Sequence, residues 1–345
     1  MQHNVLIVGF GLAGWALTEF LKKQGISFVV FDPLETSSSK AATGIYNPVV
    51  LKRFRAVEQA KALMETSLPF YNQPRYANCK HTMSIFRVFA NAAEQNKWTI
   101  ASDNPELSPY LGATAPTLNT HIKSPFGLGK VHQTGWIDTV ALLTSAQRML
   151  ESDGRFVSET FNYKALSVSS NGVSYRNWNA THVVFAEGVG VAHNPWFSKL
   201  PIIPNKGEWL IVSCKGLDLD NIVKGSVFIV PLGSDVYRVG ATYERAFDHT
   251  LPSKTGKDWL VAQFKKVVDL PFEVLHHGAG LRPTTPDRKP IIGQHPNHDN
   301  LWCVNGLGSR GVLWSLYLAS LLVEALKGKQ AIPETLHIRR FFSSL

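Results

Sequence analysis

A glycine-rich turn near the amino terminus constrains the fold more than any other feature of this sequence. Val5–Val8 is a short, wholly apolar run, as in a buried parallel strand. It leads into Gly9-Phe10-Gly11-Leu12-Ala13-Gly14, a full G-x-G-x-x-G, and residues 15–24 then have the apolar spacing of a helix. A second apolar run, 28–31, ends at Asp32. This order of strand, turn, helix, strand and acid predicts a dinucleotide-binding βαβ unit.

Each part of this unit has a physical role in holding a dinucleotide. Gly9 allows the tight turn, Gly11 lets the backbone approach a pyrophosphate, and Gly14 lets the helix lie close to the strand. The helix N-terminus offers N–H groups and a partial positive charge to the phosphates. Asp32 can accept hydrogen bonds from the ribose hydroxyls, and Pro33 follows where a basic residue would read a 2′-phosphate. The sequence therefore favours FAD or NAD over NADP.

Three later segments are rich in small residues and glycine; the first of them would let a loop pass close to a bulky planar ligand, although taken alone it reads as a flexible loop. Lys40-Ala41-Ala42-Thr43-Gly44 follows the second strand, and an apolar run over 181–185 ends in Ala186-Glu187-Gly188. Gly306-Leu307-Gly308-Ser309-Arg310-Gly311 precedes a predicted helix over 312–326. A helix N-terminus at this last turn would stabilise the negative charge that a reduced flavin carries near N1, so the turn is consistent with FAD.

Composition narrows the class of protein. A chain of 345 residues with 44% apolar and 18% charged residues predicts two packed domains and excludes general disorder. The net charge of +9 permits an anionic partner without naming one. Cys79, Cys214 and Cys303 lie far apart, which argues against a disulfide framework or a thiolate metal site. No secretory or membrane-spanning segment is recognisable, so we expect a cytoplasmic protein with reduced thiols and no membrane partner.

The histidines give no metal-binding pattern. The sequence has 12 of them, and none forms an HExxH or Cys/His arrangement. His276 and His277 are adjacent, and on a strand they would face opposite sides. We therefore predict no metal site.

Taken together, these motifs resemble the FAD-dependent D-amino-acid oxidase (DAO) superfamily, in its glycine oxidase and sarcosine oxidase branch. The resemblance extends from end to end and also includes residues 135–138, 204–208, 240–244 and 280–283. Residues 44–48, 240–243 and 308–311 look most like the C-terminal flavin domain of the bifunctional tRNA enzyme that makes 5-methylaminomethyl-2-thiouridine. That enzyme also carries a methyltransferase domain, which we do not expect within these 345 residues.

The resemblance implies an α/β fold in which a Rossmann-like FAD-binding domain is interleaved with a second α+β domain built on an antiparallel sheet. Short strand-like runs at 209–212, 228–231 and 236–240, separated by turn signals, support the antiparallel sheet. The relatives that bind flavin covalently carry a cysteine close to the position of Leu281. This chain has no cysteine there, so the FAD is expected to be non-covalent. The implied segments are 1–50, 131–190 and 275–345 for the FAD-binding domain, and 51–130 and 191–274 for the substrate-binding domain.

The implied activity is oxidation of the C–N bond of a small amino acid or secondary amine, by hydride transfer to flavin N5 and hydrolysis of the imine. The resemblance places Arg282 where it holds the substrate carboxylate, and a guanidinium suits that role. The alternative is a structural pair with Asp287. Tyr243 and Tyr46 are the other catalytic candidates. The expected cofactor-binding residues are Gly9, Phe10, Gly11, Leu12, Ala13, Gly14, Asp32, Pro33, Lys40, Ala41, Ala42, Thr43, Gly44, Phe161, Ala186, Glu187, Gly188, Arg282, Gly306, Leu307, Gly308, Ser309, Arg310 and Gly311.

Two other functions stay open from the sequence. Oxidative removal of a carboxymethyl group from a modified tRNA wobble uridine uses the same C–N chemistry and would make tRNA a partner. A flavin-binding interaction module with little turnover is the third reading. The side chain of Glu187, where the family usually has Ala or Thr, is either solvent-exposed or at the cofactor edge. The amine, the electron acceptor and the oligomeric state are not specified by the sequence.

Overall fold

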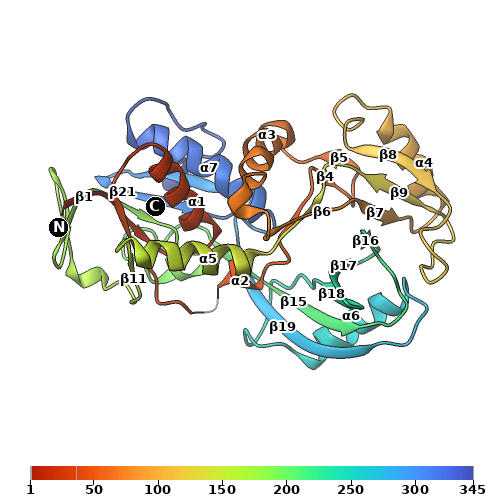
Figure 1. Ribbon diagram of the computed structural model, residues 1–345. Coiled ribbons are helices and arrows are strands. Elements are labelled where there is room, and N and C mark those ends of the chain that lie inside the picture. Colours follow the sequence, from red (N-terminus) through yellow and green to blue (C-terminus); the bar gives the residue numbers. More distant parts are fainter. Residues whose placement is uncertain (1, 36, 345) are drawn as a thin grey trace. The chain divides into compact units, whose positions relative to one another are not determined.

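The computed structural model describes residues 2–35 and 37–344, and it divides into two compact units (Figure 1). Unit 1 comprises Met1–Ala42, Thr139–Asn205 and Leu281–Leu345, and unit 2 comprises Thr43–Asp138 and Lys206–Gly280. Met1, Thr36 and Leu345, which the sequence assigns to the FAD-binding domain, lie outside the described residues.

Unit 1 is built on a largely parallel sheet. Strand β1 (Gln2–Val8) pairs in parallel with β2 (Phe28–Phe31) and with β14 (Trp178–Phe185), and β14 pairs in parallel with β21 (His298–Asn305). Every residue of β2 is buried, as expected for a strand covered on both faces. Helix α1 (Leu12–Lys23) lies beside α7 (Gly311–Leu326) (Figure 1). The other elements are α2 (Ser38–Ala41), α5 (Thr139–Ser152), β11 (Phe156–Val157), η2 (Tyr163–Ala165), β12 (Leu166–Ser169), β13 (Gly172–Tyr175), η3 (Gly188–His193), β20 (Ile291–His295) and η4 (Ile338–Ser344).

Unit 2 carries the predicted antiparallel sheet. Strand β18 (Val236–Gly240) pairs antiparallel with β15 (Ile203–Ser213) and with β17 (Phe228–Gly233). The full strand order is β19-β15-β18-β17-β16-β7-β9-β8, where β19 is Glu273–Thr284. The other elements are β3 (Ile45–Tyr46), β4 (Val49–Val50), β5 (Arg55–Ala56), α3 (Ala60–Tyr71), η1 (Pro74–Tyr76), β6 (Lys80–Thr82), β7 (Ile85–Val88), α4 (Ala92–Ser102), β8 (Leu111–Ala115), β9 (Leu128–Val131), β10 (Gly135–Ile137), β16 (Ile222–Lys224) and α6 (Lys254–Lys265).

One face of this sheet forms the core of unit 2. Leu210 and Val212 of β15 and Tyr237 of β18 pack there with Leu260 and Phe264 of α6. Because side chains alternate along a strand, the residues between them point to the opposite face of the sheet.

The unit boundaries differ from the ones expected from the sequence. Residues 43–50 and 131–138 belong to unit 2, because β3 pairs with β10 and β10 pairs with β6. Residues 191–205 belong to unit 1, where Val191, Phe197 and Leu200 enter its core. Residues 275–280 belong to unit 2, because β19 continues its sheet.

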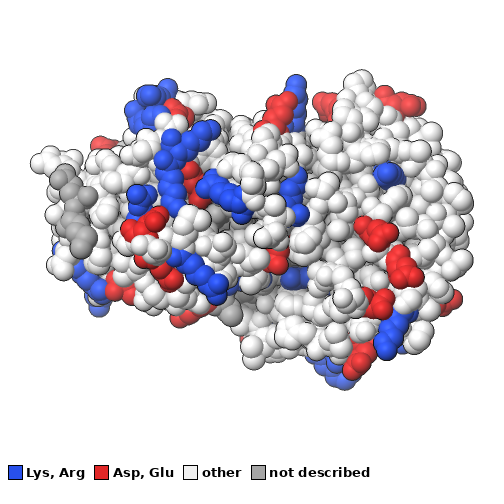
Figure 2. Space-filling view, in the orientation of Figure 1, with Lys and Arg blue, Asp and Glu red and all other residues white. Residues whose placement is uncertain are grey.

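Three further findings concern the described residues. Cys79, Cys214 and Cys303 are free, buried thiols. No described helix combines the length and the apolarity needed to cross a bilayer. Residues 2–35 and 37–344 contain no group of three or more His, Cys, Asp or Glu side chains arranged to hold a metal ion. On the face shown in Figure 2, Lys and Arg side chains are interspersed with Asp and Glu.

Candidate functional site

The first glycine turn is closely packed by its own surroundings. Gly9 has φ +99°, and a Cβ there would lie 2.6 Å from the carbonyl oxygen of Ala186. A Cβ on Gly14 would lie 2.0 Å from the carbonyl oxygen of Gly9, and one on Gly11 would lie 2.8 Å from Ser39 Oγ. At Gly9 and Gly14 the blocking atoms are backbone oxygens, so these two positions require glycine, whereas the Ser39 hydroxyl that faces Gly11 is a side chain that can move. The turn and the first turn of α1 also contain Phe10, Leu12 and Ala13.

Asp32 is held against this turn. Its Oδ2 accepts a hydrogen bond from the backbone N–H of Phe10 at 2.7 Å, and its Oδ1 accepts one from Leu34 at 2.8 Å. Pro33 lies between Asp32 and Leu34. Each carboxylate oxygen keeps a second lone pair, so Asp32 can still accept from ribose hydroxyls.

The run of three serines before Lys40 has a role that the sequence analysis missed. Ser39 Oγ accepts a hydrogen bond from the N–H of Leu12 at 2.9 Å, at the N-terminus of α1. Ser37 caps α2 by accepting from the N–H of Lys40 at 3.3 Å, and the Ser38 hydroxyl donates to the carbonyl of Leu281. Ser39 therefore lies where a phosphate would meet this helix. Ala41 ends α2 and Ala42 is its C-cap.

The second glycine turn is held by Asn305, which the sequence analysis also missed. Asn305 is 1% exposed; its Nδ2 donates to the carbonyl of Gly188 at 2.8 Å, and its Oδ1 accepts from the N–H of Gly306 at 2.7 Å. Gly308 has φ +56° and donates its N–H to the carbonyl of Pro283 at 2.9 Å. The sequence does contain a signal for this role, because Asn305 is a polar residue placed between an apolar run and a glycine-rich turn. Leu307 and Ser309 lie in this turn, and Arg310 is the N-cap of α7.

The two glycine turns meet within unit 1. A Cβ on Gly311, the first residue of α7, would lie 3.0 Å from Leu12 Cδ1, so the N-termini of α7 and α1 adjoin. Gly188 lies next to Pro283, since a Cβ on it would be 3.8 Å from the proline Cγ. Adjoining helix N-termini with glycine approaches suit a dinucleotide that carries a pyrophosphate. The residues present therefore fit FAD.

Arg282 is held by a buried amide. Its Nη1 donates to Asn205 Oδ1 at 3.0 Å, and Asn205 is 0% exposed. The expected alternative partner, Asp287, instead accepts from Arg340 Nε at 3.0 Å. Burial opposes the charge of Asp287, but the hydrogen bonds from Arg340 and Lys289 lower its pKa overall. Asn205 thus sets the orientation of the Arg282 guanidinium.

Glu187 turns toward other side chains of unit 1. It accepts from the Tyr163 hydroxyl through Oε1 and from Asn194 Nδ2 at 2.8 Å through Oε2. Asn194 Oδ1 accepts from the backbone N–H of Trp196 and of Phe197, which leaves its amide group directed at Glu187. Burial raises the pKa of Glu187 despite these hydrogen bonds, and burial together with Glu187 raises the pKa of Tyr163.

We expect the Glu187→Gln variant to gain stability relative to wild type as the pH rises. Glu187 has a higher pKa in the folded protein than in the unfolded chain, so a rising pH ionises it in the unfolded chain first. Its contribution to the free energy of unfolding therefore falls as the pH rises above the pKa of the unfolded chain. Thermal unfolding of both proteins with excess FAD, between about pH 5 and pH 8, measures this difference. The control is Glu159→Gln, at a carboxylate that also accepts from a tyrosine hydroxyl but pairs with Arg176 at 2.6 Å. A Glu187→Gln difference independent of pH would contradict the prediction.

Three further residues that the sequence predicts for the cofactor site are Phe161, Thr43 and Gly44. Phe161 is buried in the core of unit 1, where it stacks on Tyr175 with ring centroids 4.1 Å apart. Thr43 and Gly44 belong to unit 2, and a Cβ on Gly44 would lie 1.9 Å from the carbonyl oxygen of Ile137. This contact accounts for glycine at position 44.

The two tyrosine candidates belong to unit 2 and differ in exposure. Tyr46 is 1% exposed, and its hydroxyl would lie 2.4 Å from a Cβ on Gly135. Burial raises the pKa of Tyr46, partly opposed by a hydrogen bond with Thr82. Tyr243 is 52% exposed. Tyr46 is thus a core side chain, whereas Tyr243 is accessible to a ligand.

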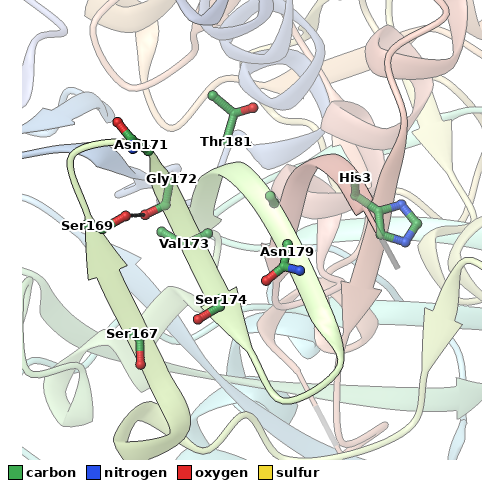
Figure 3. A pocket seen from close by; sticks show the side chains of 10 residues that line it. His3, Ser167, Ser169, Asn171, Gly172, Val173, Ser174, Asn179 and Thr181 are labelled. Carbon is green, nitrogen blue, oxygen red and sulfur yellow. Dashed lines mark hydrogen bonds between the residues drawn. The ribbon is translucent and has the colours of Figure 1, made fainter.

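A cavity of about 280 Å³ on unit 1 is separate from the glycine turns (Figure 3). It is lined by the hairpin strands β12 and β13, by β14 and by His3 near the start of β1. His3 is six residues before Gly9 along β1, or about 20 Å of extended chain. Ligands of open α/β sheets bind beyond the carboxyl ends of the strands, so this cavity lies at the wrong end for the dinucleotide. None of the sequence-predicted site residues lines it.

Comparison with known proteins defines the class. The family of FAD-dependent oxidoreductases called DAO matches residues 4–325. The chain belongs to this family, which confirms the resemblance drawn from its motifs. It is an FAD-dependent oxidoreductase, and so an enzyme rather than a flavin-binding interaction module.

Individual relatives are similar over nearly the whole chain. The glycine oxidase of Pseudomonas putida is 30% identical over 363 residues, 96% of each protein. The tRNA 5-methylaminomethyl-2-thiouridine biosynthesis bifunctional protein MnmC of Marinobacter nauticus is 22% identical over 97% of this chain, which spans only 57% of that protein. The crystal structure of glycine oxidase from Geobacillus kaustophilus superposes with a TM-score of 0.81 over 96% of each chain at 18% identity, which supports the fold.

Proposed function

We propose that this enzyme oxidises the C–N bond of a small amino acid or secondary amine that carries a carboxylate. The observation that carries this proposal is the setting of Arg282. Its guanidinium is oriented by the buried Asn205, and the next residue, Pro283, accepts the N–H of Gly308 in the second glycine turn. This hydrogen bond puts Arg282, the proposed cation for the substrate, next to the turn proposed for the cofactor. The glycine oxidase relatives support the same substrate class.

Different residues of unit 1 have different roles in the proposed reaction. FAD, when bound, supplies the acceptor of two electrons and a proton as a hydride at flavin N5. Arg282 binds the substrate carboxylate through its planar fork, and Asn205 keeps that fork in one orientation. The N-terminus of α7 places partial positive charge beside the second glycine turn, where it favours developing negative charge. The oxidised amine leaves as an imine, which water hydrolyses to a carbonyl compound and a free amine.

A second candidate is removal of a carboxymethyl group from a modified tRNA uridine. The similarity to MnmC and the net charge of +9 favour it. The carboxymethyl group of such a uridine carries a carboxylate next to a secondary amine, and Arg282 would bind that carboxylate. The interspersed charges on the face shown in Figure 2 provide no continuous basic surface there for a polyanion, so we rank this candidate second.

Anaerobic mixing of the FAD-loaded enzyme with glycine, sarcosine, other N-alkyl amino acids and carboxymethylaminomethyl-modified tRNA tests both candidates. We expect a small carboxylated amine to bleach the visible absorbance of the oxidised flavin. Bleaching by the modified tRNA alone would establish the second candidate, and no bleaching by any of them would overturn the first.

Replacing Arg282 tests its proposed role. We expect Arg282→Gln to retain FAD and to lose about a hundredfold in kcat/KM for the amine, as when one partner of a buried charge pair is removed. Arg282→Lys keeps the charge but not the fork, so its loss is smaller. Arg148→Gln, at an exposed position on α5, is the control and keeps wild-type kinetics. Unchanged kinetics in Arg282→Gln would disprove the role.

A further inference from the structure

Glu187 follows the carboxyl end of β14, between the two glycine turns of unit 1. Strand β14 pairs in parallel with β1 and with β21, and these two strands lead into the first and the second glycine turn. A Cβ on Gly9 would lie 3.3 Å from Glu187 Cα. On the other side, the carbonyl of Gly188 accepts from Asn305, which precedes the second turn. Ligands of such sheets bind beyond the carboxyl ends of the strands, so the turns that suit a dinucleotide flank Glu187.

The hydrogen-bond partners of Glu187 accommodate both a carboxylate and a neutral carboxyl group. Asn194 Oδ1 accepts from two backbone N–H groups, so its Nδ2 is fixed as a donor to Glu187 Oε2. The partner of Oε1 is the Tyr163 hydroxyl, which can donate to a carboxylate or accept from a protonated carboxyl group. Glu187 can therefore gain or lose a proton and keep both contacts.

The surroundings of Glu187 favour its neutral form. Burial raises the pKa of Glu187 by more than the hydrogen bonds from Tyr163 and Asn194 and the charge of His193 lower it. On β21, burial and Glu187 raise the pKa of the Cys303 thiol, and burial and Glu187 also raise the pKa of the Tyr163 hydroxyl, so both keep their protons. The groups here that can change charge are thus Glu187 itself and His193.

A pyrophosphate held by the two turns would oppose the ionisation of Glu187 further. Both of its phosphates carry negative charge, and a like charge nearby raises the pKa of a carboxyl group. In residues 2–35 and 37–344, no Lys or Arg side chain forms an ion pair with Glu187 that would offset this repulsion. Each unit by which the pKa rises corresponds to a tenfold difference in FAD affinity between the neutral and the ionised form of Glu187.

We propose that Glu187 is a proton-binding residue of the cofactor site, which takes up a proton from the solvent when FAD binds. Below the pKa of Glu187 in the apoenzyme the side chain is already neutral, and the affinity for FAD is highest. As the pH rises through that value, Glu187 ionises in the apoenzyme and must be protonated again on binding, so the affinity falls. This inference is independent of which amine the enzyme oxidises.

Titration of the apoenzyme with FAD tests this linkage without turnover. Between about pH 6 and pH 9 we expect the Kd of wild type, measured by the change in flavin fluorescence, to rise at least about tenfold. Calorimetric titration in two buffers of different ionisation enthalpy measures the accompanying proton uptake. In Glu187→Gln the amide can donate to Tyr163 and accept from Asn194, as a neutral carboxyl group does, so we expect the Kd to stay near its low-pH value. The control His193→Gln, at an exposed position, keeps the pH dependence of wild type.

A second variant keeps the test decisive if Glu187→Gln does not fold. Tyr163→Phe removes a hydrogen bond that lowers the pKa of Glu187, so we expect its FAD affinity to begin falling at a higher pH than that of wild type. The same pH dependence in wild type and Glu187→Gln, an unshifted one in Tyr163→Phe, or FAD binding above neutral pH without proton uptake overturns the proposal. A pH dependence that disappears in His193→Gln assigns the proton to His193 and overturns it as well.

Discussion

The Gly14→Val variant is expected to be purified without FAD and to unfold at a lower temperature than wild type. A Cβ on Gly14 would lie 2.0 Å from the carbonyl oxygen of Gly9 and 3.7 Å from Ile7 Cγ2. The first contact is with backbone that is itself confined, because Gly9 lies against the carbonyl of Ala186. The helix must therefore move away from β1, which destroys the turn that the pyrophosphate needs. The cost of such overpacking is about 3 kcal/mol.

The ratio of flavin to protein absorbance and thermal unfolding measure the two effects. The control is Gly154→Val, at a glycine with φ +66° and nothing within 4 Å of the added Cβ. This variant has only the cost of a left-handed backbone, about 1–2 kcal/mol, and keeps its FAD. If Gly14→Val retains a full complement of FAD, the close approach of α1 to β1 is not what the cofactor site requires.

The parts of the site that the sequence predicted are those in which the chemistry is local. The roles of Gly9, Gly11 and Gly14 follow from spacing within one turn, and Asp32 ends the next strand. Ser39 and Asn305 were missed because their partners are distant in the chain: Leu12 is 27 residues from Ser39, and Gly188 is 117 residues from Asn305. No periodicity encodes such contacts.

Arg282 shows the same limit. The sequence offered Asp287, five residues away, as the structural partner, but that carboxylate accepts from Arg340, and the amide that holds Arg282 is Asn205, 77 residues earlier. The boundaries of the two units differ from the expected ones for a related reason. The sequence predicts Gly44 as a cofactor-binding residue, and its close contact with the Ile137 carbonyl, 93 residues later in the chain, lies within unit 2. The fold class depends on the order of apolar runs and glycine turns along the chain, which the sequence shows directly, and its prediction is confirmed.

The largest stability effect in unit 2 is expected at Glu208, a carboxylate that is 0% exposed. It accepts from Lys206 Nζ at 2.8 Å, from the Ser253 hydroxyl at 2.8 Å and from the Ser253 N–H at 3.0 Å, and it contacts His277 Nε2 at 2.8 Å. Ser253 also caps α6 by accepting from the N–H of Gly256 at 3.0 Å. One side chain thus ties β15, the start of α6 and β19 together.

We expect Glu208→Gln to lower the free energy of unfolding by about 3–5 kcal/mol, measured by urea denaturation of the FAD-loaded enzyme at neutral pH. The substitution leaves Lys206, which is 2% exposed, as a buried cation without its carboxylate, and it turns an amide donor toward other donors. The control is Asp258→Asn, which breaks the exposed ion pair with Lys254 at 2.6 Å and costs less than about 1 kcal/mol. A loss no larger than that of the control would contradict the prediction.

The pH dependence and a double variant identify charge as the cause. Burial opposes ionisation of Glu208, but the hydrogen bonds from Lys206 and Ser253 lower its pKa below the ordinary value of 4.5. Its contribution is therefore present above that value and is lost as the pH falls through the folded-state pKa, so the gap between wild type and Glu208→Gln narrows in acid. Replacing both charges, as Lys206→Met with Glu208→Leu, removes the unpaired cation and recovers most of the stability. If the double variant is as unstable as Glu208→Gln, packing rather than charge holds these three elements together.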